Sequence, residues 1–150
     1  MGDELGLGND HGYLDDPARA GDNRWLHRPA MDWEVAGRRA EDGTVERRIF
    51  SALAALAAAR RATPQLHAAT PVEVADLQQP QLFAFLRRHP LGTLVAVHNV
   101  TEQPQWVSPM ALYLVGHDQP VDRISGQAAR VEHGQVVLDP YQAVWLTAPT

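Results

Sequence analysis

The sequence predicts an α+β chain, in which a long polar loop and a single helix precede an antiparallel β module. Residues 1–43 are dense in Gly, Asp, Asn, Arg and Pro, and residues 44–62 carry apolar side chains at helical spacing. From Pro71 onward the apolar period changes to two. Because no helical stretch separates the later short runs, they favour a sandwich or a small barrel over a parallel sheet. The predicted domains are residues 1–64 and residues 65–150.

The overall composition is that of a globular protein, with 45% apolar and 21% charged residues and a formal net charge of -5. The acidic balance argues against a nucleic-acid surface, which needs a basic excess. The sequence has no cysteine, which excludes disulfides and thiolate metal sites and fits the reducing cytoplasm in which we expect the chain. No apolar run reaches the ~18 residues of a membrane span. The acidic first residues, MGDELGLGNDHG, do not resemble a signal peptide.

The first 43 residues predict an ordered, irregular segment. Loops longer than about 12–15 residues are uncommon unless they are functional or disordered. Disorder fits poorly, because the segment contains many apolar anchors: Leu5, Leu7, Tyr13, Leu14, Trp25, Leu26, Met31 and Trp33. One short helical turn is expected near Met31 to Arg39.

A helix is predicted over residues 44–62, because Thr44 can cap its start and Pro64 ends it. Its apolar face comprises Val45, Ile49, Leu53, Leu56 and Ala57, with Phe50 beside them. The many alanines favour close approach to a sheet or to a neighbouring helix. A loop and one helix cannot close a hydrophobic core, so we expect this part to require further protein.

The later runs VEVAD, QLFAFLRRH, GTLVAVHNV, QWVSPMALYLV, QVVLD and AVWLT predict six or so strands. Four aromatic residues of this module could form a platform on which a sugar stacks: Trp106, Tyr113, Tyr141 and Trp145. Their alternation along the expected strands favours packing in the core instead.

The stretch GDNRWLHRP gathers hydrogen-bonding groups around one indole. Arg24 and Arg28 flank Trp25, and an arginine fork can pair bidentately with a carboxylate in a sugar pocket. From the residues alone, an exposed or structurally paired arginine is favoured. His27 has a pKa suited to a general base, although a histidine in such a loop more often hydrogen-bonds the backbone.

Other chemistries have little support. The carboxylates Asp3, Glu4, Asp10, Asp15, Asp16 and Asp22 could include a glycosidic pair, but a solvated acidic loop is the favoured interpretation. The seven histidines lack zinc spacing, so no metal site is expected. Phosphate-loop motifs and the nucleophile elbow are missing from the sequence.

The stretches GDELGLGNDHGY, GDNRWLHRPAMDW and LDPYQAVWLTA together resemble the C-terminal portion of amylosucrases, which belong to the α-amylase superfamily. The resemblance implies that Gly2–Glu4 end the eighth strand of a (β/α)₈ barrel and that residues 5–43 form the loop after it. The helix over 44–62 would be the last barrel helix, and a C-terminal β-sandwich would follow. Barrel active sites are built from such loops.

The same resemblance implies a retaining glucosyltransferase that moves glucose from sucrose onto an α-1,4-glucan and releases fructose. Arg24 matches a substrate-binding arginine that pairs with an aspartate at the floor of the glucosyl subsite, and that aspartate would lie outside this chain. Asp22, Trp25, His27 and Arg28 match its loop support. The catalytic carboxyl groups would lie on earlier strands, outside this chain. No catalytic residue, metal or cofactor is therefore expected here.

The expected partners are sucrose, an α-glucan and the missing N-terminal portion of the barrel, without which the fragment should be inactive. Three alternatives stay open. A sucrose hydrolase would share the loop, a stand-alone carbohydrate-binding β module would bind glucan through residues 66–150, and a structural remnant would bind nothing.

Overall fold

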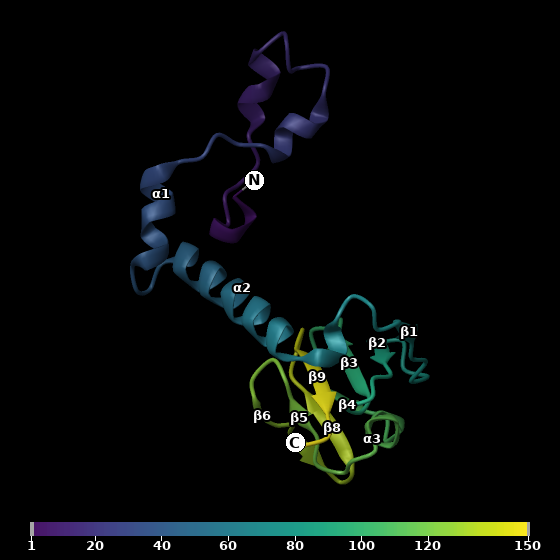
Figure 1. Ribbon diagram of the computed structural model, residues 1–150. Helices are drawn as coiled ribbons and strands as arrows, with labels where there is room; N and C mark the ends of the chain where they lie inside the picture. Colours follow the sequence, from purple (N-terminus) through teal and green to yellow (C-terminus); the bar gives the residue numbers. More distant parts are fainter. Residues whose placement is uncertain (1, 150) are drawn as a thin grey trace. The chain divides into compact units, whose positions relative to one another are not determined.

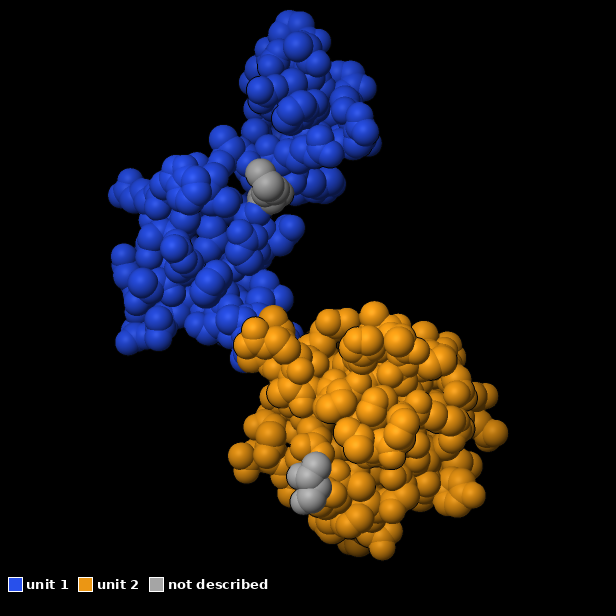
Figure 2. All heavy atoms as spheres, viewed as in Figure 1, with its two compact units in different colours: residues 1–56 blue, residues 57–150 orange. Residues whose placement is uncertain are grey.

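The computed structural model describes residues 2–149. They form two compact units, the loop unit, which ends at Leu56, and the β unit, which begins at Ala57 (Figure 2). The division falls inside the longest helix. The domain boundary at 64/65 stays a prediction, because a unit defined by contacts need not coincide with a domain. Among the described residues, no helix combines the length and the apolar character that a bilayer crossing requires.

The loop unit is ordered by short helical turns, as expected. Its elements are η1 (Asp3–Leu5), η2 (His11–Asp15), η3 (Asn23–His27), α1 (Trp33–Gly37), η4 (Arg38–Ala40) and the first part of α2 (Val45–Ala62) (Figure 1). Helix α1 confirms the turn predicted near Met31 to Arg39, and Asp32 caps it by accepting hydrogen bonds from the backbone of Glu34 and Val35, both at 3.0 Å.

The structure does not show the barrel end that the resemblance implies. Asp3, Glu4 and Leu5 form the 3₁₀ turn η1 instead of the end of a strand. Gly2 and Gly6 flank this turn with φ values of 99° and 69°. A strand needs a paired neighbour, and no strand is present among described residues 2–72.

Helix α2 confirms the predicted helix and its cap. Thr44 Oγ1 accepts a hydrogen bond from the backbone N–H of Arg47 at 3.2 Å. Most of the predicted apolar face is solvent-exposed along the part of α2 in the loop unit, whereas Ile49 is half-buried and Glu46 is the buried residue of the helix. The exposed fractions are 58% for Val45, 39% for Phe50, 45% for Leu53 and 37% for Leu56.

The β unit contains two antiparallel sheets, which confirms the antiparallel prediction. One has the order β1-β2-β3-β9-β5-β6 and the other β4-β8-β7 (Figure 1). The strands are β1 (Glu73–Val74), β2 (Leu82–Arg87), β3 (Leu94–Asn99), β4 (Gln105–Val107), β5 (Val121–Asp122), β6 (Gln127–Ala128), β7 (Val131–Glu132), β8 (Gln135–Leu138) and β9 (Ala143–Thr147).

The main core of the β unit lies between these sheets and the short helix α3 (Met110–Val115). Register pairs Val95 with Leu146 and Val97 with Val144, so their side chains share the inner face of the larger sheet. The opposite, outer face carries a smaller cluster in which Phe85 and Trp145 pack against buried residues that include Leu66. Leu66 belongs to η5 (Pro64–Leu66), the turn that follows α2.

The run QWVSPMALYLV is not one strand, and that prediction is wrong. β4 ends at Val107, and α3 begins after Pro109, which cannot donate a ladder hydrogen bond. The core prediction for the aromatic residues is wrong at three positions, since Trp106, Tyr113 and Tyr141 are 46%, 80% and 65% exposed. Tyr113 is exposed because the buried side of α3 is formed by Ala111, Leu112 and Val115.

Candidate functional site: the arginine-tryptophan turn and the hollows of the β unit

Two aspartates shape the loop around GDNRWLHRP. Asp10 caps η2 by accepting the backbone N–H of Gly12 at 2.9 Å, and Asp22 caps η3 by accepting that of Arg24 at 3.0 Å. The backbone N–H of Asp10 donates to the carbonyl of Leu26 at 2.8 Å, which ties the two turns together. The cluster of turn-forming residues therefore builds a defined local structure.

Arg24 forms a bidentate ion pair with Asp22. Its Nε lies 2.8 Å from Oδ1 and its Nη2 lies 2.7 Å from Oδ2. The hydrogen bond from the Arg24 side chain is the main reason that the pKa of Asp22 is lowered to about 2, and the same bond raises the pKa of Arg24. The Arg24 side chain stays 72% exposed.

Trp25 is half-buried and lies close to two guanidinium groups. The Cζ of Arg19 is 4.6 Å from the indole centroid, and that of Arg28 is 5.7 Å away. Beside them, His27 Nδ1 is 3.1 Å from Oδ1 of Asn9. The structure thus brings together the five residues predicted from the sequence, which are Asp22, Arg24, Trp25, His27 and Arg28. It adds Arg19 and Asn9, which lie outside the motif.

Asp22 and Arg24 present a fixed ion pair and hydrogen-bond donors. With its pKa at about 2, Asp22 is ionised at neutral pH and has no proton to donate. The exposed guanidinium of Arg24 has further N–H donors beyond those directed at Asp22. No group of three or more His, Asp or Glu side chains suited to a metal ion occurs among residues 2–149. The substrate-binding role of Arg24 and the loop-support role of its neighbours stay predictions.

A hollow of about 800 Å³ lies in the β unit beside α3. Its lining includes Tyr113 from α3, His117 and Asp118 from the turn after the helix, and His133 from the β7–β8 hairpin. The sequence pattern did not predict it, because the segment was expected to be a strand. The proline at 109 and the helical spacing of Ala111, Leu112 and Val115 are the signals that could have indicated α3.

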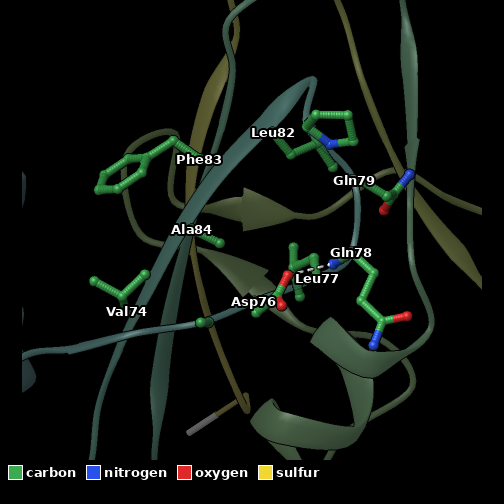
Figure 3. Close-up of a pocket in the computed structure, with 10 residues that line it drawn as sticks. Val74, Asp76, Leu77, Gln78, Gln79, Leu82, Phe83 and Ala84 are labelled. Carbon is green, nitrogen blue, oxygen red and sulfur yellow. Dashed lines mark hydrogen bonds between the residues drawn. The ribbon is translucent and has the colours of Figure 1, made fainter.

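A second hollow, of about 390 Å³, lies along β1 and β2 (Figure 3). Val74 and Phe83 lie at the same side of this view, and both are exposed, by 78% and 51%. The Phe83 ring also contacts the rings of Phe85 and His98, at centroid distances of 6.2 and 5.8 Å. An apolar aromatic surface therefore occupies the outer face of the larger sheet.

Most of the β unit is similar to a known family of protein domains. Residues 76–147 match a family model described as "Amylosucrase, C-terminal domain". This segment therefore resembles the C-terminal domain of amylosucrases over 72 of the 150 residues. The match begins after the arginine-tryptophan turn, so the similarity to this family model does not extend to the loop unit.

Solved structures share the fold of this chain over about two thirds of its length or more. AmyP in complex with maltose is 19% identical with a TM-score of 0.55, over 67% of this chain and 20% of that chain. AmyP in complex with maltotriose is 17% identical with a TM-score of 0.57, over 73% and 23%. An Anoxybacillus alpha-amylase is 22% identical with a TM-score of 0.56, over 99% and 28%. The chain therefore spans only 20% to 28% of the length of these structures.

Proposed function

We propose that this chain is the C-terminal portion of an amylosucrase, and that its loop unit forms one wall of the glucosyl pocket. The family-model match over residues 76–147 supports the assignment to amylosucrases among α-amylase proteins. The ordered turn that presents Arg24 supports the placement of the pocket wall, because a sugar-binding arginine must be held in a fixed position to orient its ligand.

Arg24 is the residue on which the proposed pocket depends. Its guanidinium already forms two hydrogen bonds with the carboxylate of Asp22. Its remaining exposed N–H donors can reach a sugar hydroxyl or a second carboxylate from the barrel. Trp25, which is within cation-π distance of Arg19 and Arg28, helps to hold the turn in place. The nucleophile and the acid/base of the double displacement are carboxyl groups that we place on the missing barrel strands.

The exposed face of α2 is the surface that we assign to the missing barrel portion. Val45, Phe50, Leu53 and Leu56 are each more than a third exposed, which is unusual for four apolar residues on one helix face. The alanines between them allow a close approach of another backbone. Covering this face would supply the core that the loop unit cannot build from one helix.

The proposal is tested by replacing the C-terminal segment of an amylosucrase with residues 2–150 and measuring fructose release from sucrose. We expect the chimera to turn over sucrose and the 150-residue chain alone to be inactive. Arg24→Ala should lower turnover of the chimera by about 100-fold, since a misplaced sugar loses the orientation term of catalysis. Arg61→Ala, an exposed arginine at the end of α2, serves as the matched control. Wild-type kinetics in the Arg24 variant would show that Arg24 is misassigned.

The products separate the two enzyme hypotheses. An amylosucrase chimera should convert most of the transferred glucose into glucan, whereas a sucrose hydrolase should release equal amounts of glucose and fructose. Retention of glucan by the chain without any sucrose turnover in the chimera would favour the third hypothesis, a carbohydrate-binding β module.

A further inference from the structure

We infer that the hollow beside α3 is a binding site for a neutral saccharide, with the Tyr113 ring as its stacking platform. The hollow measures about 800 Å³, within the range of about 300–1,000 Å³ that is typical of small-molecule sites. It lies wholly within the β unit and on elements separate from the arginine-tryptophan turn.

Two rigid turns frame the hollow. Gly116 ends α3 with a φ of 76°, and its backbone N–H donates to the carbonyl of Leu112 at 2.8 Å. On the other side, His133 and Gly134 form the two-residue turn between β7 and β8, with φ values of 49° and 74°. Two consecutive residues at positive φ are the mark of a tight hairpin, so both walls are held by the backbone.

Tyr113 is available to a ligand because the fold does not use it. The ring is 80% exposed, while Leu112, next to it on α3, is only 8% exposed and belongs to the main core. Leu112 and half-buried Val131 supply an apolar floor to the hollow. An exposed aromatic ring beside such a floor suits the apolar C–H face of a pyranose.

The polar lining indicates a neutral ligand with many hydroxyl groups. His117 Nδ1 accepts the backbone N–H of Gln119 at 3.0 Å, so its neutral ring carries the proton on Nε2 and can donate. Asp118 adds an acceptor, and Gln119 and His133 can each donate and accept. Among the described residues that line the hollow, none is a lysine or an arginine, which disfavours phosphates and other anions.

The test is affinity electrophoresis of the full 150-residue chain in native gels that contain glycogen. We expect glycogen to retard the wild-type chain. Tyr113→Ala should weaken the retardation roughly tenfold or more, expressed as an apparent dissociation constant, because the stacking ring is lost. Tyr113→Phe keeps the ring and should bind like the wild type. Alanine is the best helix former, so the alanine variant is not expected to unfold α3.

Two control variants isolate the hollow from the rest of the surface. Met110→Ala changes an exposed residue of α3 outside the lining, and Tyr141→Ala removes an exposed tyrosine elsewhere. Both should be retarded like the wild type. Unretarded migration of the wild-type chain, or equal retardation of Tyr113→Ala, would overturn the inference. Neither result bears on Arg24, because the sucrose chimera tests that residue separately.

Discussion

Arg24 and Asp22, two residues apart, hold each other through two parallel hydrogen bonds of 2.8 and 2.7 Å. The pair is completed by the backbone, since Asp22 Oδ1 also accepts the N–H of Arg24 at 3.0 Å. One carboxylate therefore fixes both the turn and the direction of the guanidinium. This pairing fixes the orientation of the Arg24 guanidinium, whose side chain is 72% exposed.

The ion pair predicts an unusually acidic titration of Asp22. Its pKa is lowered to about 2 by the Arg24 hydrogen bond, so its stabilising contribution is complete above the unfolded value of ~3.9 and is lost as the pH falls through about 2. Carboxyl ¹³C NMR should record this midpoint. In Arg24→Gln the midpoint should return toward ~3.9. An unchanged midpoint in that variant would contradict the pairing.

We predict that Gly6 and Gly8, near the start of the loop unit, differ in how well they tolerate substitution by alanine. Gly6 has a φ of 69°, and a Cβ there would lie 2.6 Å from Cδ1 of Ile49 on α2. Gly6→Ala should lower the free energy of unfolding of the loop unit by about 1–2 kcal/mol, measured by hydrogen exchange. Gly8→Ala is the matched control, because its Cβ would meet nothing within 4 Å, and a change of at most about 0.5 kcal/mol is expected.

We predict that substitution of Asp122 strongly destabilises the β unit. It is 5% exposed, and its carboxylate accepts the backbone N–H groups of Ile124, Ser125 and Trp145 at 3.0, 3.1 and 2.9 Å. Asp122→Ala should lower the free energy of unfolding by about 2–3 kcal/mol, since buried donors are left unpaired. Urea denaturation measures the loss. Exposed Asp118 gives the control, and equal stability of the two alanine variants would refute this role of Asp122.

We predict that His98 makes the stability of the β unit depend on pH. Its Nε2 is buried without a described partner, and burial lowers the pKa of the ring. The unfolded chain therefore binds a proton more readily, so stability is complete above the unfolded value of ~6.5 and falls as the pH drops below it. His98→Gln should remove this part of the pH dependence between pH 7 and pH 5 in urea titrations. Parallel curves for variant and wild type would contradict the prediction.

The exposed face of α2 predicts that substitution there affects assembly and not local stability. Leu53 is 45% exposed, so Leu53→Gln should change the free energy of unfolding of the 150-residue chain by at most about 0.5 kcal/mol. In the chimera, the same change should destabilise the barrel, which thermal denaturation would reveal. Ser51→Gln, on the same exposed helix, is the control. A chimera indifferent to Leu53→Gln would mean that the barrel does not cover this face.

Sequence periodicity predicts the elements that are long enough to carry it. Helix α2 and strands β2, β3, β8 and β9 each have at least four residues, and all five lie within predicted segments. Strands β5, β6 and β7 have two residues each, which is too short for any period, and the sequence did not indicate them. Helix α3 was mistaken for a strand because six apolar residues in a row suit either structure.

The candidate sites were predictable only in part. The residues of the arginine-tryptophan turn were selected by their composition, and the structure brings them together. The pairing of Arg24 with Asp22 could not be foreseen, because it depends on the 3₁₀ geometry of η3. The hollow beside Tyr113 joins segments some twenty residues apart in the sequence, and its shape follows from tertiary packing that no local pattern encodes.

The position of β9 has a consequence for synthesis of the protein. This final described strand, Ala143–Thr147, pairs with β3 on one side and with β5 on the other. While a nascent chain is still on the ribosome, β3 and β5 therefore have no neighbour at this position, and both present open backbone edges. Translation that stops before Ala143 would leave a product without its central strand, which we expect to aggregate or to be degraded.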